Sequence, residues 1–156
     1  MRKGLKNYTS DARVENSLAK IEAFVVKQGA TQFSKEYKDG LVLDVVFIIP
    51  ILSGELPIRL PARVEQVKQK LYGKRSTYTP AMEEQARRTA WANIRDWLDA
   101  QMALIETEQV KVEEIFLPYM TDQSGKTLFE YMQENQFKMP QLPAGRGEKS
   151  IEGNVL

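Results

Sequence analysis

Cysteine and histidine are both absent from this chain of 156 residues. Without cysteine the chain has no disulfide and no thiolate metal site, and nothing in its composition indicates secretion. Without histidine it lacks the Ser-His and Cys-His nucleophile systems, the usual zinc sites and the commonest general base. Any catalysis would rest on carboxylates, lysine or tyrosine. We therefore expect a binding protein more readily than an enzyme, with no catalytic residue, no cofactor and no metal site.

Long hydrophobic runs are lacking as well. The longest, residues 45–52, is far shorter than the roughly 20 residues of a membrane-spanning helix. The basic start "MRKGLK" is followed by polar residues and not by the apolar segment of a signal peptide. Apolar content of 42% with 28% charged residues is typical of a globular domain. We expect no membrane association and a cytoplasmic location.

The first half of the chain carries one helical pattern and three strand patterns. Apolar residues recur at helical spacing from Asp11 to Gly29. Asp39-Gly40 stands between two β-rich runs and predicts a hairpin. The run 41–49 has apolar residues on both faces, as a central strand does. Pro57 cannot donate to a ladder, so the next run is predicted to be an edge strand. The pattern predicts an antiparallel meander.

The second half is predicted to be helical. After a short helix over 62–72, Thr79 is a suitable N-cap and Pro80 a suitable first helical residue. No helix breaker follows before Pro118, which allows one helix of about 37 residues, although a break near 107–111 stays open.

A last short helix is predicted over 127–135, which gives an α+β fold: helix, three-stranded meander, short helix, long helix, short helix. We expect a single domain over 1–139, with a flexible start at 1–10 and a disordered tail at 140–156.

Charge is unevenly distributed along the chain. Residues 59–95 hold nine Lys or Arg against three Asp or Glu, and residues 96–134 hold two against nine. Basic residues interleaved with tyrosines are typical of nucleic-acid binding. Glu83 and Glu84 each precede an arginine by four residues, a favourable intrahelical pairing. The candidate nucleic-acid-binding residues are Arg63, Lys70, Lys74, Arg75 and Arg88, with Lys74 and Arg75 the least neutralised.

The two tryptophans fall on different faces of the long predicted helix. Trp91 belongs to an apolar stripe with Leu98 and Met102 and is expected in the core. Trp97 lies about 100° further round, together with Leu104 and Ile115. The helix is thus predicted to have a second apolar face for a partner, which leaves open a protein-binding module that inhibits a host defence or replication protein.

One line of charges on the same helix predicts self-association. Its order is base, base, acid, acid, acid, so two helices laid antiparallel would set arginines opposite acids, as a two-fold symmetric homodimer requires. Exposed pairs would select this orientation, while apolar burial would supply the affinity. The candidate self-association residues are Arg88, Arg95, Trp97, Asp99, Leu104, Glu106 and Glu113.

Two further motifs resemble catalytic ones. "SGKT" at 124–127 lacks the first glycine of a P-loop, because position 120 is Met120, and it is predicted to be a turn. Asp44 interrupts an apolar strand, as the metal-binding acid of a nuclease would. The lysine expected two residues after the acid of the third strand is missing, since Glu55 is followed by leucine and proline. A metal-dependent nuclease stays an alternative, behind an acid that lies on an exposed patch or is paired with a nearby base.

The segments "IRLPA" (58–62), "EQARRTAWANIRDWLDAQMALIE" (84–106), "EIFLPY" (114–119) and "NQFKM" (135–139) resemble an uncharacterised group of small phage and prophage proteins. No activity, and so no catalytic or binding residue, follows from the resemblance. It implies a mobile-element gene expressed in a bacterial host cell, a setting in which small non-enzymatic proteins serve DNA metabolism or bind host proteins. We therefore expect a phage or mobile-element accessory protein that contacts nucleic acid through the basic loop and the start of the long helix.

Overall fold

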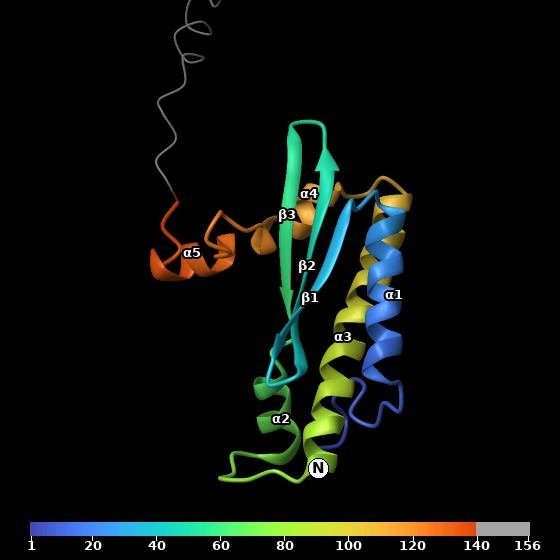
Figure 1. The fold of residues 1–156 in the computed structure, drawn as a ribbon, viewed down its shortest axis with the longest axis vertical. Coiled ribbons are helices and arrows are strands. Elements are labelled where there is room, and N and C mark those ends of the chain that lie inside the picture. Colours follow the sequence, from blue (N-terminus) through green and yellow to red (C-terminus); the bar gives the residue numbers. More distant parts are fainter. Residues whose placement is uncertain (140–156) are drawn as a thin grey trace, which may run out of the picture.

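A computed structural model describes residues 1–139 of the chain (Figure 1). The fold is α+β, as predicted, with a three-stranded antiparallel sheet in the order β1-β2-β3. The elements are α1 (Val14–Lys27), β1 (Gln32–Lys38), β2 (Leu41–Ile51), β3 (Gly54–Pro61), α2 (Val64–Tyr72), α3 (Pro80–Glu106), α4 (Val112–Phe116), the 3-10 turn η1 (Leu117–Tyr119) and α5 (Leu128–Glu134). The predicted disordered tail lies outside the described residues. No helix within residues 1–139 is both long and apolar enough to cross a bilayer.

The meander follows from its turn residues. Asp39 and Gly40 have φ values of 53° and 77°, the left-handed pair that a tight two-residue hairpin needs. β2 is the central strand, and β3 is an edge strand, as Pro57 predicted. The outer edge of β3 is partly covered, because the Thr121 N–H donates to the Pro57 carbonyl over 3.0 Å and Ile58 forms a bridge with Met120. The chain after α4 is therefore attached to the sheet.

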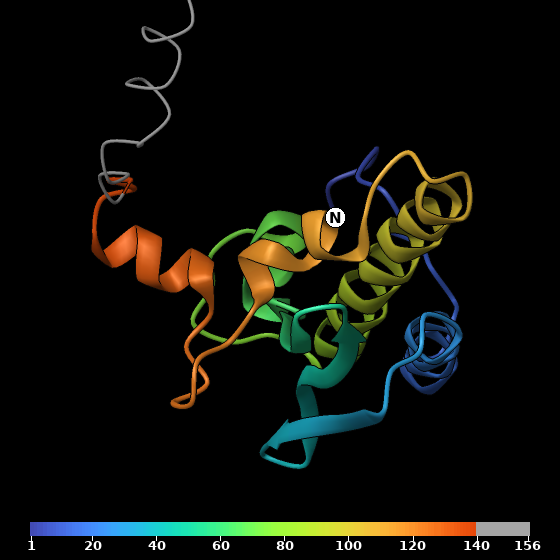
Figure 2. The same cartoon turned by 90° about the horizontal axis from the view of Figure 1, so that it is seen from above.

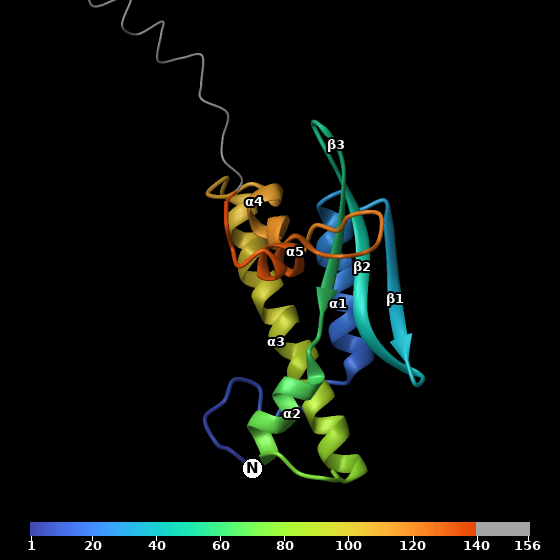
Figure 3. The same ribbon diagram turned by 90° about the vertical axis from the view of Figure 1, so that its left-hand side faces the viewer.

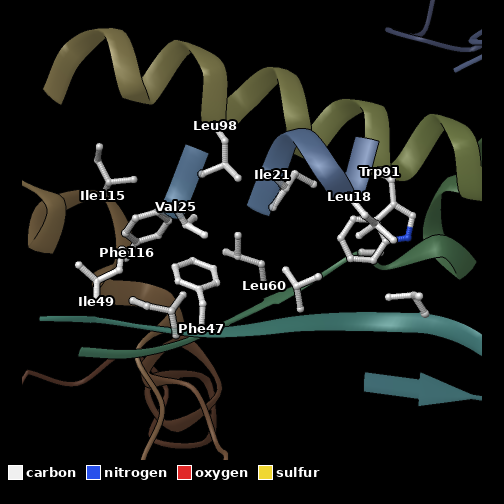
Figure 4. Close-up of a cluster of buried hydrophobic side chains, with 14 of the residues drawn as sticks. Leu18, Ile21, Val25, Phe47, Ile49, Leu60, Trp91, Leu98, Ile115 and Phe116 are labelled. Carbon is white, nitrogen blue, oxygen red and sulfur yellow. The ribbon is translucent and has the colours of Figure 1, made fainter. Parts of the chain in front are cut away.

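The core lies between the sheet and the two longest helices. Figure 2 shows α1 and α3 side by side over one face of the sheet, with α5 set apart from α1. Phe47 of β2 meets Phe116 edge to face, with ring centroids 5.3 Å apart (Figure 4). Trp91 of α3 is fully buried, which confirms its predicted place in the core.

The long helix ends at Glu106, so one continuous helix to Pro118 is wrong and the break near 107–111 is right. Thr107 caps the end, since its Oγ1 donates to the carbonyls of Ala103 and Leu104. Glu108 then takes a left-handed conformation with φ 59°. Such a turn commonly ends a helix, usually with glycine in that position. The chain reverses into α4.

Candidate nucleic-acid interface

The N-terminal segment, whose first ten residues the sequence predicts to be flexible, is held against α2 and α3 by hydrogen bonds. The Arg2 N–H donates to the Leu71 carbonyl over 2.9 Å, and Thr89 Oγ1 donates to the Asn7 carbonyl over 2.9 Å. Gln85 Nε2 donates to the carbonyls of Tyr8 and Ser10. Figure 3 shows this segment beside α2 and the first turns of α3. Its contacts bring the basic start of the chain to the end of α2.

Cations from two distant parts of the sequence therefore meet at one end of the molecule. We call this set the basic end; it consists of Arg2, Lys3, Lys6, Lys70, Lys74 and Arg75. Lys6 forms an ion pair with Asp96 at 3.4 Å. Within residues 1–139 the other five have no acidic partner within 4.0 Å. Unpaired exposed cations are the groups that phosphates attract.

The loop between α2 and α3 is folded on itself. The Tyr78 hydroxyl donates to the Gly73 carbonyl over 2.8 Å and accepts from the Arg75 N–H at 3.3 Å. Arg75 Nε in turn donates to the Tyr72 carbonyl over 2.9 Å. Gly73 has φ 78°, a conformation that glycine adopts without strain. These contacts fix the backbone and leave Lys74 exposed to solvent.

One acid of α2 and one of α3 share a buried lysine. Lys68 Nζ lies 2.8 Å from Glu65 and 2.9 Å from Glu83, and it also lies over the Tyr78 ring at 4.5 Å. Hydrogen bonding to Glu65, with a further bond to Glu83, raises the pKa of Lys68 in spite of its burial. Lys68 thus offsets one of these two negative charges and ties α2 to α3.

The predicted nucleic-acid-binding residues do not all belong to one surface. Lys70, Lys74 and Arg75 lie at the basic end. Arg63 lies at the opposite end of α2, where it forms the N-cap and stands 5.6 Å from the centre of the Phe129 ring. Arg88 is paired with Glu84 at 3.3 Å. The basic end contains neither of these two arginines. It contains Arg2, Lys3 and Lys6 instead, and no local pattern in the sequence indicates that these three lie near α2.

Two neighbouring hollows, which we together call the groove, lie along α3 from the basic end. Thr89, Asn93 and Trp97 follow at intervals of four residues and so lie along one line of the helix. One hollow of about 250 Å³ is lined by Lys6, Lys70 and the apolar Leu5, Val67 and Leu71. A second hollow of about 200 Å³ is lined by Leu60, Ile94, Trp97 and Tyr119. Asn93 lines both, so the two hollows are neighbours.

The second apolar face of α3 is covered within the chain. Trp97 meets Phe116 and Tyr119 edge to face, with centroids 6.2 and 5.9 Å apart. Ile115 is buried and Leu104 half-buried. The expectation that this face is left for a partner is therefore wrong along most of its length. Part of Leu104, and the part of Trp97 and Tyr119 that lines the second hollow, stay exposed.

The line of charges predicted for self-association faces α1 instead. Arg95 donates to Ser17 Oγ of α1 over 3.2 Å and pairs with Asp96 at 3.0 Å, and Glu106 pairs with Lys27 of α1. Glu113 lies in α4, beyond the end of the helix. Asp99 is exposed. Arg95 and Glu106 thus have partners within the chain and Glu113 lies off the helix, while the predicted homodimer itself stays a prediction.

Asp44 lies on the sheet face opposite the core, beside a single arginine. Arg59 Nε is 3.7 Å from Asp44 Oδ2, and the same guanidinium reaches Glu36 at 3.4 Å and the Gly125 carbonyl at 2.6 Å. Burial raises the pKa of the Asp44 carboxyl, against the opposing attraction of Arg59. Within residues 1–139 no three His, Cys, Asp or Glu side chains are grouped to hold a metal ion. Of the two favoured interpretations, an exposed patch is wrong, because Asp44 is buried, and pairing with a nearby base is confirmed.

The "SGKT" segment forms a turn closed by its own aspartate. Asp122 Oδ1 accepts from the N–H groups of Ser124 and Lys126 and from the Ser124 hydroxyl. Hydrogen bonding from Ser124 lowers the pKa of the Asp122 carboxyl. The Lys126 ammonium pairs with Glu134 of α5. A carboxylate thus occupies the amides that a phosphate would need, which agrees with the predicted turn.

No protein-family model, no curated protein and no solved structure matches the chain. Function must be argued from the chemistry of these surfaces.

Proposed function

We propose that this protein is a non-enzymatic accessory protein, of the kind that phages and other mobile elements encode, and that it binds nucleic acid through the basic end. The observation that carries the proposal is the hydrogen bond between Arg2 and Leu71, which joins two basic segments some seventy residues apart in sequence. It sets Arg2 and Lys3 beside the end of α2 and the 73–78 loop. A backbone of phosphates is the polyanion that such a spread of exposed cations fits.

The charge state of the surroundings supports the same proposal. Glu65, Glu83 and Glu84 carry three negative charges, which the three positive charges of Lys68 and the two arginines that follow Glu84 on α3 balance. The positive field of the basic end is therefore not cancelled by its own helices. Cations at the C-terminal end of α2 are also favoured by the helix dipole, which makes them compatible with a stable fold.

A salt titration of binding tests the proposal. We expect labelled single-stranded and duplex oligonucleotides to bind in fluorescence anisotropy, with an affinity that falls steeply with salt. Lys74→Glu with Arg75→Glu should weaken binding to every sequence at least ten-fold. It should also reduce the slope of log affinity against log salt by about 1.4–1.8, since each of the two lost phosphate contacts removes about 0.7–0.9.

The matched control is Lys20→Glu with Lys35→Glu, which makes the same change in net charge on exposed positions of α1 and β1. This control variant should bind oligonucleotides within about two-fold of the wild-type affinity, because charges beyond a Debye length of about 8–10 Å are largely screened. Equal losses in the two double variants, or a wild-type protein that binds no oligonucleotide at moderate salt, would refute a specific basic interface.

Protein binding is the second candidate, on a different surface from the one the sequence predicted. At the β1–β2 hairpin, Tyr37, Leu41 and Leu43 are 62%, 47% and 44% exposed. Leu41 and Leu43 line a hollow of about 510 Å³ together with Arg63 and Arg87. An apolar, charge-rimmed surface of this kind suits a host or phage protein. Leu41→Asp with Leu43→Asp should abolish capture of such a partner without changing nucleic-acid affinity.

A further inference from the structure

The groove along α3 leads from the basic end to a pair of aromatic rings. Trp97 and Tyr119 are both half-buried, and both line the second hollow. Their ring planes stand at 68° to each other with centroids 5.9 Å apart. Two rings at this angle form a corner, in which a planar group stacked on one ring presents its edge to the other. A nucleobase has the flat face that such a corner accepts, and stacking of this kind tolerates any base.

From these contacts we infer that the protein's ligand is single-stranded nucleic acid, with one unstacked base held at Trp97 and Tyr119 and the adjoining phosphates held at Lys6 and Lys70. This inference rests on the proposed function and narrows it to a strand form. Bases inside a duplex are stacked and expose only their edges, so a ring in a hollow cannot stack on them. A strand with free bases can reach it.

The spacing along α3 fits a continuous track. Thr89 and Trp97 are eight residues apart, which corresponds to about 12 Å along the helix axis. The Lys6 and Lys70 side chains line the hollow at the Thr89 end, and the aromatic corner lies at the other. Cations at one end and aromatic rings at the other are the two components of surfaces that bind single strands without sequence preference.

Asn93 supplies a polar group midway along the groove. Its Oδ1 accepts from Asn7 Nδ2 over 3.0 Å, and that same Asn7 group donates to Asp96. This contact orients the amide, whose NH₂ group donates to no acceptor within residues 1–139. It is placed to donate to a phosphate oxygen or a base edge, in a groove that is otherwise largely apolar.

Intrinsic fluorescence tests the inference on the folded wild-type chain. The chain has two tryptophans, and Trp91 is fully buried, so a stacked base can quench Trp97 alone. We expect unstructured oligo(dT) and oligo(U) to quench the emission, and a duplex of equal length to leave it unchanged. Trp97→Phe, which keeps an aromatic ring against Phe116, should abolish the quenching while retaining binding.

Affinity measurements supply the second arm. Tyr119→Leu should weaken single-strand binding about ten-fold and duplex binding hardly at all, because stacking contributes about 1–3 kcal/mol per base. Tyr131→Leu is the matched control, since Tyr131 is an exposed tyrosine of α5 outside the groove. The strand-form inference fails if quenching is absent or equal with duplex, or if the two leucine variants behave alike.

The two proposals fail separately. If Lys74→Glu with Arg75→Glu weakens binding of both strand forms while Trp97 and Tyr119 do not respond, the basic end binds nucleic acid and the aromatic corner plays no part. If no oligonucleotide of either form binds, both proposals fall together.

Discussion

The backbone N–H of Arg2 lies 2.9 Å from the carbonyl oxygen of Leu71, to which it donates. This bond satisfies one of the last carbonyls of α2, which have no partner inside the helix. It also fixes the first residues of the chain where their cations add to those of Lys70 and Lys74. The stability of the N-terminal segment and the charge of the basic end are therefore coupled.

That coupling predicts that an uncharged substitution will weaken binding. Thr89→Val keeps the shape of the side chain but removes the hydroxyl that donates to the Asn7 carbonyl. We expect about 1 kcal/mol of lost stability, the cost of a hydrogen bond of this type, and an affinity for oligonucleotides reduced about three-fold. Amide hydrogen exchange of residues 2–10 should accelerate.

The control is Thr107→Val, which removes an exposed hydroxyl that donates to two carbonyls of the last turn of α3. It should lower stability without changing the affinity or the exchange of the N-terminal amides. Equal effects on affinity from both variants would show that binding follows overall stability and not the position of the first residues.

Lys68 gives a prediction at alkaline pH. Lys68→Met removes the ammonium shared by Glu65 and Glu83 and should lower the free energy of unfolding by about 1–2 kcal/mol at pH 7. Because the folded pKa of Lys68 is raised, its contribution is fully present below the unfolded value of about 10.4. It is lost as the pH rises through the higher folded value.

Urea unfolding from pH 7 to 11 measures this difference. The gap between wild type and Lys68→Met should stay constant to about pH 10 and then narrow. Lys70→Met, at an exposed position in the last turn of the same helix, should show only the small gap of about 0.3–1 kcal/mol that the helix dipole contributes. A gap that closes between pH 7 and 9 would contradict the assigned partners.

For Asp44 we expect substitution to have the opposite effect on stability at pH 7. Its folded pKa is raised by burial, so the group favours folding below its unfolded pKa of about 3.9 and loses that contribution as pH rises through the folded pKa. Asp44→Asn, which cannot ionise, should therefore be at least as stable as wild type at pH 7. Its advantage should shrink as the pH falls through the folded pKa of Asp44.

Thermal unfolding from pH 3 to 7 follows the Asp44 effect. Arg59→Met is the contrasting variant, since it leaves Asp44 and Glu36 together without a cation and frees the Gly125 carbonyl. It should lose about 1–3 kcal/mol at pH 7. If Asp44→Asn proves the more damaging of the two at neutral pH, the carboxylate has a role that its pairing with Arg59 does not explain.

Elements set by local chemistry could be predicted from the sequence. Thr79 caps α3 with a hydrogen bond from the Met82 N–H, and Pro80 begins that helix. Asp39 and Gly40 form the hairpin, and Pro57 lies in an edge strand. In each case one or two adjacent residues determine the backbone, so the pattern is sufficient.

The candidate site could be predicted only in part, because its contacts are distant and use backbone atoms. The carbonyls of Asn7, Tyr8 and Ser10 hold the N-terminal segment, and any residue type could supply them. The helix break after Glu106 has neither proline nor glycine; Glu108 takes the left-handed conformation itself. Cover for Trp97 comes from Phe116 and Tyr119, which reach it only because of that break.

The last prediction separates an internal ion pair from one between two molecules. Lys27 of α1 pairs with Glu106 at the end of α3 in the same chain. Lys27→Glu and Glu106→Lys should each lower stability by about 0.2–1 kcal/mol, as for exposed pairs. The double variant with both changes should recover the wild-type value, because the pair is re-formed with its charges exchanged.

Chemical unfolding at low salt, with sedimentation alongside, measures both effects. Under the antiparallel dimer predicted from the sequence, Glu106 would face an arginine of the other molecule. Mixing Glu106→Arg with Glu113→Arg and Arg88→Glu with Arg95→Glu would then produce a heterodimer. We expect no such heterodimer, and we expect Arg95→Glu to be destabilising by itself, because Arg95 donates to the buried Ser17 hydroxyl of α1. If mixing produces a heterodimer, and the Lys27–Glu106 charge exchange does not restore the wild-type free energy of unfolding, then Glu106 lies at an interface between two molecules.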